Sequence, residues 1–414
     1  MTTSPRVGCG TVLRSVPDSA IQARLLAVGQ RLAKLPWWAH VLFIYAAARA
    51  FSTIVLGAVA SRQVPSPWAS ASPGYVEFVN FWDSGWYERI YDGGYPTELP
   101  RGDDGEVLQN QWAFYPLFPA SVRLASQLTG AGWNPTAPIL AAVCGALAAL
   151  VIYRIFRLRA DHRDALWAVA LVAFFPVSPI LQIPYAESLH LMLLAVALYL
   201  VVTERYLSAI PVVVLMCLAR PAGVPFAAML GLLLLARLMF HRAETAALIR
   251  LACLTVFSGL AALAWPFAAW VATGVPDAYV QTETVWRGTH LTVFVPWVDV
   301  SVELLGPVLG PITLALVAGG FIGALLSPAG RQLGLPLQLW CGAYLLYLAA
   351  FWNPQTSTFR VLLPLFPLAL VAVLASTSRA YRGLAVAVFA CLQVVWVAWL
   401  WAYFPMFEGA DHSP

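Results

Sequence analysis

The sequence predicts an all-α protein that crosses a membrane many times, because of its composition, its apolar segments and its charge distribution. Of its 414 residues, 60% are hydrophobic and only 11% are charged, whereas soluble domains carry about 25% charged residues. Such a chain belongs to the polytopic membrane class. The net charge of +4 does not indicate a nucleic-acid-binding protein, because the arginines are spread between the apolar segments.

Apolar segments of membrane length, or slightly less, recur about eleven times. They lie at 37–60, 137–156, 165–183, 186–203, 206–220, 222–240, 249–272, 304–326, 336–352, 360–376 and 383–404. Only the turn LARPAG, 218–223, separates the fifth from the sixth, which leaves open a helical hairpin or one broken helix. We expect a cytoplasmic tail at 1–35, one transmembrane domain at 36–404 and a short outer tail at 405–414.

The charges give an independent test of this topology, since cytoplasmic loops carry an excess of Lys and Arg. With the N-terminus inside, 16 of the 24 basic residues lie on the inner side and about 15 of the 20 acidic residues on the outer side. Both long polar loops, 61–136 and 273–303, then face outward. We therefore expect the plasma (inner) membrane of a cell, with the functional site on the extracytoplasmic face.

The first outer loop contains the segment FWDSGWYERIYDGGY, 81–95. Helical spacing predicts an amphipathic helix at 78–90 lying in the headgroup layer, with an apolar stripe of Phe78, Phe81, Trp82, Trp86 and Ile90. Asp83 and Tyr87 are four residues apart and share a face at the margin of that stripe. Asp83 is then either a solvated acid or a base placed at the depth of a lipid headgroup.

Two further parts of this loop have different characters. Residues 97–108 read as an exposed, mobile excursion. The segment NQWAFYPLFP, 110–119, has two prolines that make a rigid return to the membrane. Its residues Gln111 and Tyr115 are candidates for contact with a sugar, and interfacial anchoring is the alternative.

Polar residues also mark the outer ends of later segments. Glu187 and His190 are three apart at the start of the fourth segment, and ionisable groups at membrane depth are functional candidates. Three arginines on the outer side, Arg220, Arg287 and Arg360, oppose the charge bias. Binding of a phosphate group is one reason for their presence, and a structural ion pair is the other. In the second outer loop, Trp286 and His290 are candidates for a sugar site.

Nothing in the sequence indicates a cofactor. The six cysteines are far apart, which argues against a disulfide framework or a cysteine metal site. Glu187 and His190 lack a clear third ligand within reach, so a zinc site is not expected. There is no Gly-rich nucleotide loop, and a divalent metal stays possible without support from the sequence.

The motifs resemble those of the PIG-V-type mannosyltransferases, the second mannosyltransferase of GPI-anchor assembly and its actinobacterial relatives, in the GT-C glycosyltransferase class. The matching segments are WDSGWYERIYDGGY at 82–95, FYPLFP at 114–119, PYAESLHL at 184–191, LARPAG at 218–223 and FRVLLPLFP at 359–367. The resemblance implies a GT-C-type bundle whose catalytic Asp, here Asp83, lies in the first outer loop. It also implies a polyprenyl-phosphate-mannose donor and an acceptor hydroxyl.

Together these observations predict an inverting mannosyltransferase of the cell envelope that acts on a lipid- or glycan-linked acceptor. Asp83 is the expected base, and Arg360 with Arg220 or Arg287 binds the donor phosphate. Tyr87, Glu187, His190, Trp286, Tyr115 and Gln111 are the expected sugar and acceptor contacts. A transferase of another polyprenyl-linked sugar and a transporter of a lipid-linked sugar remain the alternatives.

Overall fold

The structure is a computed structural model, and it describes residues 34–240, 244–287 and 292–405. The chain divides into two compact units, Met1–His40 and Val41–Pro414. The predicted N-terminal tail lies almost wholly outside the described residues, as does the predicted C-terminal tail beyond residue 405. The five described cysteines are free.

The regular secondary structure of the described residues is helical. Outside the helices, an isolated antiparallel β-bridge pairs Arg101 with Val107. The helices of the two predicted outer loops are α3 (Tyr75–Val79), α4 (Ser84–Gly93), η1 (Gln111–Ala113), α5 (Leu117–Thr129) and α12 (Ala278–Arg287). The remaining helices are α2 (Trp37–Ala60), α6 (Trp133–Arg157), α7 (His162–Ala173), η2 (Ser178–Gln182), α8 (Glu187–Val202), α9 (Tyr206–Ala219), α10 (Gly223–Phe240), α11 (Thr245–Thr273), α13 (Val295–Leu326), α14 (Pro328–Arg331), α15 (Leu335–Phe351), η3 (Thr356–Leu365), α16 (Pro367–Leu374), α17 (Arg379–Val395) and η4 (Trp396–Trp401).

Six of the described helices are long and apolar enough to cross a membrane, or seven if the bent pair η3 and α16 is one span. Three shorter apolar helices, α8, α9 and α15, accompany them. The protein is therefore a multi-pass membrane protein. The prediction of about eleven spans is not confirmed, although each predicted segment coincides with one or more of the described helices.

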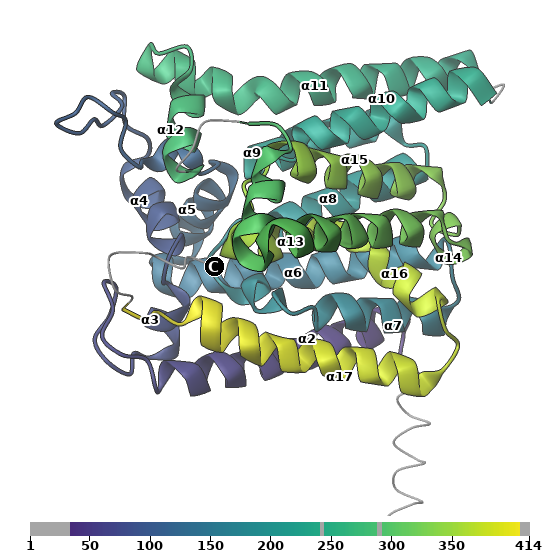
Figure 1. Ribbon diagram of the computed structural model, residues 1–414, viewed down its shortest axis with the longest axis horizontal. Coiled ribbons are helices and arrows are strands. Elements are labelled where there is room, and N and C mark those ends of the chain that lie inside the picture. Colours follow the sequence, from purple (N-terminus) through teal and green to yellow (C-terminus); the bar gives the residue numbers. More distant parts are fainter. Residues whose placement is uncertain (1–33, 241–243, 288–291, 406–414) are drawn as a thin grey trace, which may run out of the picture. The chain divides into compact units, whose positions relative to one another are not determined.

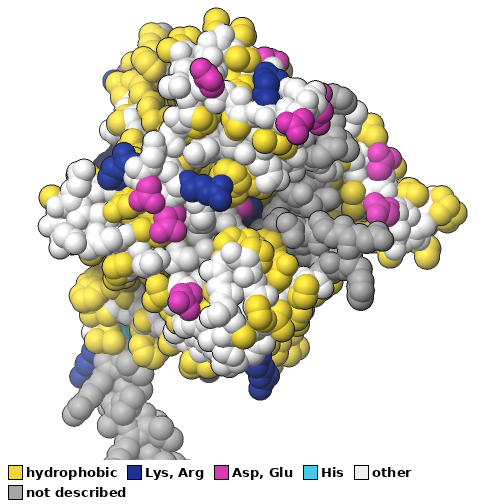
Figure 2. Space-filling model, turned by 90° about the vertical axis from the view of Figure 1, so that its left-hand side faces the viewer, with side chains coloured by type: hydrophobic (Ala, Val, Ile, Leu, Met, Phe, Trp, Pro, Cys, Tyr) yellow, Lys and Arg dark blue, Asp and Glu magenta, His cyan; other side chains and the backbone are white. Residues whose placement is uncertain are grey.

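Within the second unit, the long helices pack lengthwise against one another: α6 lies on α8, α8 on α9, α9 on α11, and α10 on both α11 and α15. The short helices α4, α5 and α12 gather at one end of this bundle (Figure 1). Figure 2 looks at that end and shows acidic and basic side chains distributed over it between apolar patches. The segments of the predicted outer loops thus cover the end of α8 at which Glu187 lies.

A buried arginine holds the centre of the bundle together. Arg49 of α2 donates from Nη2 to the carbonyl oxygen of Ala173, at 2.8 Å, and to the hydroxyl of Ser178, at 2.9 Å. Its Nη1 donates to the Ser178 carbonyl oxygen. A charge at membrane depth needs such partners, and these bonds tie α2 to the α7–η2 connection that leads to Glu187.

The predicted amphipathic helix at 78–90 is wrong as a single element. The helix is interrupted between α3 and α4, where Trp82 has a left-handed φ of 61°. The stripe packs into the protein rather than into the headgroup layer, since Phe78 and Phe81 are fully buried. The Trp82 indole donates to the carbonyl oxygen of Trp401, at 2.7 Å, which compensates an unfavourable backbone conformation for a bulky residue.

One other expectation about the loops needs correction, and the structure bears on one alternative that the sequence leaves open. Residues 97–108 are not a wholly exposed excursion, because Leu99 and Val107 are buried in a cluster with Trp112 and Trp265. The turn LARPAG joins two separate helices, α9 and α10. A Cβ atom on Gly223 would lie 2.7 Å from the Ala262 Cβ, so glycine permits the close packing of α10 on α11.

Candidate active site

A cavity of about 220 Å³ lies where the outer-loop helices meet the ends of α8, α9, α15 and η3. Nine of the ten predicted site residues line it; they are Asp83, Tyr87, Tyr115, Glu187, His190, Arg220, Trp286, Arg287 and Arg360. These residues come from segments spread over almost 280 positions of the chain. The volume lies slightly below the usual ~300–1,000 Å³ of ligand pockets, which suits one sugar unit with its linking group better than an oligosaccharide.

Asp83 is placed by the backbone turn before α4. Asp83 comes directly after Trp82 in the chain, and its backbone N–H donates to the hydroxyl of Tyr185, at 2.9 Å. One of its carboxylate oxygens forms an ion pair with Nη1 of Arg360, at 2.6 Å. Tyr87, one turn later on α4, lines the same cavity, and burial raises the pKa of its hydroxyl. The expected shared face of Asp83 and Tyr87 is confirmed.

Arg360 is held by the η3 segment, which is bound to α15 by side-chain hydrogen bonds. The Tyr344 hydroxyl donates to the Val361 carbonyl oxygen and the Trp340 indole to that of Pro364, each at 2.8 Å. The guanidinium of Arg360 also lies 5.3 Å from the centre of the Tyr185 ring, a favourable cation–π distance. Tyr185 therefore contacts both members of the Asp83–Arg360 pair.

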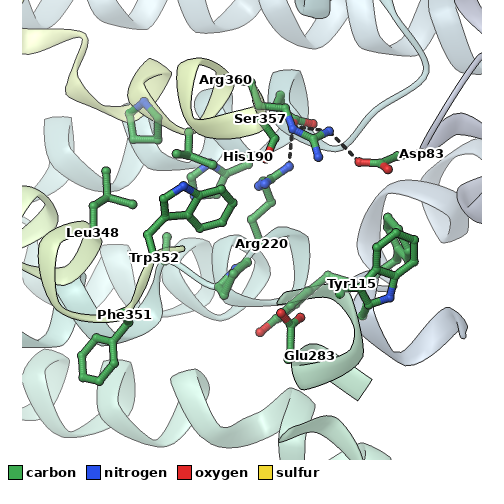
Figure 3. Close-up of a pocket in the computed structure, with 18 of the residues that line it drawn as sticks. Asp83, Tyr115, His190, Arg220, Glu283, Leu348, Phe351, Trp352, Ser357 and Arg360 are labelled. Carbon is green, nitrogen blue, oxygen red and sulfur yellow. Dashed lines mark hydrogen bonds and ion pairs between the residues drawn. The ribbon is translucent and has the colours of Figure 1, made fainter. Parts of the chain in front are cut away.

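Glu187 extends this pair into a chain of alternating charges. Figure 3 shows its members Asp83, Arg360 and Arg220. Its Oε1 lies 2.5 Å from Nη1 of Arg220 and 3.6 Å from Nη1 of Arg360. Glu187 begins α8, where the N-terminal helix dipole favours a carboxylate. Arg220 stands in extended conformation between α9 and α10. The four charges, Asp83, Arg360, Glu187 and Arg220, form what we call the paired cluster.

The helix α12 forms another wall of the cavity. Trp286 contacts Phe114 and Trp86 edge to face, with ring centres 5.4 and 5.5 Å apart. Arg287, at the end of the helix, accepts a hydrogen bond on its carbonyl oxygen from the Asn353 amide, at 3.1 Å. The neighbouring candidate His290 lies outside the described residues.

One predicted site residue does not line the cavity, and one charged residue that the motifs did not indicate does. Gln111 does not line the cavity; the short η1 turn directs Ala113, Phe114 and Tyr115 to it instead. Glu283 of α12 does line it. The sequence carried a signal for Glu283, because it lies one turn before Arg287, but an acid in a polar helix is easily taken as solvated.

The environment of Glu283 is unusual for an acid in a loop helix. Burial raises the pKa of its carboxyl, although hydrogen bonding by Tyr279 and the charges of Arg287 and Arg220 oppose that rise. No ion pair to Glu283 occurs among the described residues. The same part of the chain contains no group of three or more His, Cys, Asp or Glu residues placed to hold a metal ion.

Comparison with known proteins gives distant structural likeness only. No protein-family model matches the chain, and no curated protein matches its sequence. The oligosaccharyltransferase of Archaeoglobus fulgidus, solved with zinc and sulfate, aligns at a TM-score of 0.46 and 16% identity, over 84% of this chain and 53% of the other. AglB of the same organism, solved with an inhibitory peptide and a dolichol-phosphate, aligns at 0.44 and 15%, over 87% and 55%.

The chain spans about half the length of these oligosaccharyltransferases. The likeness concerns the arrangement of helices alone. The resemblance to PIG-V-type enzymes, which rests on the motifs, therefore stays a prediction.

Proposed function

We propose that this protein is an inverting mannosyltransferase that takes its sugar from a polyprenyl phosphate carrier at the extracytoplasmic face of the membrane. Its acceptor is a hydroxyl of a lipid- or glycan-linked molecule of the cell envelope. The observation that carries the proposal is the paired cluster: a carboxylate from the first outer loop and two arginines from remote segments meet in one cavity of a membrane protein.

In the reaction, the acceptor hydroxyl oxygen forms a bond to the anomeric carbon of the donor sugar. The bond from that carbon to the phosphate oxygen breaks, and its electron pair goes to the departing polyprenyl phosphate. The hydroxyl proton passes to the carboxylate of Asp83, which acts as general base. Attack from the side opposite the phosphate inverts the anomeric configuration.

The arginines stabilise the charge that develops on the departing phosphate. A guanidinium has five N–H donors, so Arg360 retains donors for a phosphate while it remains beside Asp83. Arg220 adds a second cation, and fixed cations of this kind are effective in a site that excludes water. The donor phosphodiester then needs no nucleotide pocket, and Arg287 is the further candidate for contact with it.

The remaining predicted residues have roles that fit their positions. Tyr87, Tyr115 and Trp286 offer aromatic surface and hydroxyl groups to a sugar ring. His190 and Glu187 stand on one turn of α8, and Nε2 of His190 has no hydrogen-bond partner among the described residues, so a sugar hydroxyl is a suitable partner. Arginine can meet one phosphate, which reduces the need for a metal in this site.

The test is transfer of radiolabel from polyprenyl-phosphate-mannose in membranes that contain equal amounts of wild type, Asp83→Asn or Asp92→Asn. Asp92 is the matched control, since it lies exposed on the same helix and outside the cavity. We expect labelled lipid or glycan with the wild type and the control, and none with Asp83→Asn. Equal labelling by Asp83→Asn would contradict the role of Asp83 as base.

Absence of label with every protein would point to the alternatives. Transfer from another polyprenyl-linked sugar, such as glucose or arabinofuranose, would retain the chemistry and change the donor. Movement of a lipid-linked sugar across the membrane without transfer would instead identify a transporter.

A further inference from the structure

The wall formed by α12 carries two charged residues that form no ion pair with the paired cluster. Glu283 and Arg287 are one helical turn apart and both line the cavity. Neither forms an ion pair with a described residue, whereas Asp83 and Glu187 both do. A carboxylate at a cavity surface without a cationic partner retains its capacity to accept hydrogen bonds from a ligand.

The titratable and charged groups around Glu283 come from α12 itself and from three other segments. Tyr279 lies one turn before it and Arg287 one turn after it on α12, and Arg220 approaches from the turn between α9 and α10. Tyr115, after η1, and Tyr347, of α15, complete the set. The Tyr115 hydroxyl donates to that of Tyr279, at 3.1 Å. Hydroxyl donors and aromatic rings therefore surround a single carboxylate.

The position of Glu283 separates it from the donor side. In Figure 3, Glu283 points into the cavity from α12, while Asp83 and Arg360 lie together at the other side of the view, with Arg220 between. Tyr347 of α15 lies near Glu283, and the aromatic residues Phe351 and Trp352 line the same cavity. A carboxylate that accepts hydrogen bonds from hydroxyl groups, next to aromatic faces, is a chemically suitable lining for a neutral sugar.

We propose that Glu283 binds the acceptor: its carboxylate accepts a hydrogen bond from a hydroxyl of an uncharged sugar or cyclitol unit. This orients the unit for attack on the donor sugar held at the paired cluster. The inference rests on the proposed function: it assigns Glu283 to the acceptor and leaves the arginines to the donor phosphate, with Asp83 as the base at the acceptor hydroxyl. Glu283 takes no proton in this assignment, because Asp83 is the base.

The role predicts a pH dependence of known sign. An ionised Glu283 accepts a stronger, charge-assisted hydrogen bond than a protonated one, and burial raises the pKa of its carboxyl above that of an exposed glutamate. The rate of transfer should therefore fall as the solution becomes acidic. The midpoint of this fall should lie at a higher pH than the midpoint expected for an exposed glutamate. Glu283→Gln should lack that decline, because an amide does not titrate there.

The experiment compares full-length wild type, Glu283→Gln, Glu283→Asp and Glu98→Gln. Glu98 is exposed in the first outer loop and does not line the cavity, so it is the matched control. One measurement is the initial rate of label transfer from polyprenyl-phosphate-mannose to membrane acceptors, across pH. The other is the rise in unfolding temperature of the purified protein on addition of polyprenyl phosphate alone.

We expect Glu283→Gln to transfer at least about tenfold more slowly, in keeping with the loss of a charged hydrogen bond, and to lose the acidic decline. Its stabilisation by polyprenyl phosphate should equal that of the wild type. Glu283→Asp, which keeps the charge but reaches less far, should transfer slowly and retain the decline. This second variant decides the matter if Glu283→Gln does not fold.

Three results would overturn the assignment. Wild-type transfer by Glu283→Gln would remove Glu283 from the acceptor site. Loss of stabilisation by polyprenyl phosphate would place Glu283 on the donor side or in a structural role. Failure of the wild type to transfer sugar from any polyprenyl carrier would overturn the proposed function itself, and this inference with it.

Discussion

The two walls of the cavity differ in how their charges are satisfied. In the paired cluster, two carboxylates and two arginines contact one another at 2.5–3.6 Å. On α12, Glu283 and Arg287 form no ion pair with described residues although both face the same cavity. The charges of the first wall are thus paired with one another, whereas Glu283 and Arg287 on the second wall form no ion pair with a described residue.

This difference has consequences for both catalysis and stability. Charges held in advance need no rearrangement when a phosphate develops negative charge, which is the main benefit of a preorganised site. They also depend on each other, because removal of one member leaves a shielded charge without its partner. We therefore expect substitutions in the paired cluster to reduce both stability and activity, and substitutions on α12 to reduce activity alone.

The largest effect should follow the loss of Arg360, which contacts both Asp83 and Glu187. Arg360→Ala should lower transfer by about 10³-fold, at the upper end of the effect of one fixed donor to a transition-state charge. The free energy of unfolding should fall by about 3 kcal/mol, as for a broken buried ion pair. Radiolabel transfer and thermal unfolding in detergent measure the two effects.

The conservative variant Arg360→Lys provides the control for charge. Lysine keeps the cation but lacks the planar arrangement of donors. It should recover stability more than activity. Full activity in Arg360→Lys would mean that a point charge suffices and that Arg360 does not bind Asp83 and phosphate together.

A smaller effect on both properties is expected for Glu187→Gln. The carboxylate oxygen of Glu187 serves Arg220 and Arg360 together, so an amide in its place leaves two guanidiniums less well balanced. We expect transfer to fall about 30-fold and the free energy of unfolding to fall by about 2 kcal/mol. Unchanged unfolding together with reduced transfer would show that Glu187 contacts substrate without organising the arginines.

On the α12 wall, Arg287→Ala should reduce transfer by about tenfold and leave thermal unfolding unchanged. The reason is that Arg287 has no ion pair among the described residues whose loss would destabilise the fold. The same two assays apply, with Arg101→Ala as control, since Arg101 is exposed and contacts Gln281 on the outer side of α12. A clear loss of stability in Arg287→Ala would contradict the distinction between the walls.

The difference between the two walls also explains which residues of the site could be predicted from the sequence. Arg220 and Arg360 stood out because outer arginines oppose the charge bias, and Glu187 because acids are rare at membrane depth. Glu283 and Gln111 lie in polar loop regions, where polar and charged side chains are ordinary and carry little information. Local spacing likewise predicted a helix through Trp82, but that residue's left-handed backbone depends on packing against η4, which is more than 300 residues away.

The smallest effect is expected for Asn353, which supports the α12 wall without carrying charge. Its side-chain amide donates to the carbonyl oxygen of Arg287, at 3.1 Å, and so joins the segment before η3 to the end of α12. Asn353→Ala should cost about 1 kcal/mol of local stability and reduce transfer about threefold, because Arg287 and Glu283 become less well oriented. The effect of Asn353→Ala should be absent in the Arg287→Ala, Glu283→Gln background. If Asn353→Ala instead lowers transfer equally in both backgrounds, Asn353 contacts substrate directly, and the α12 wall extends as far as the α15–η3 connection.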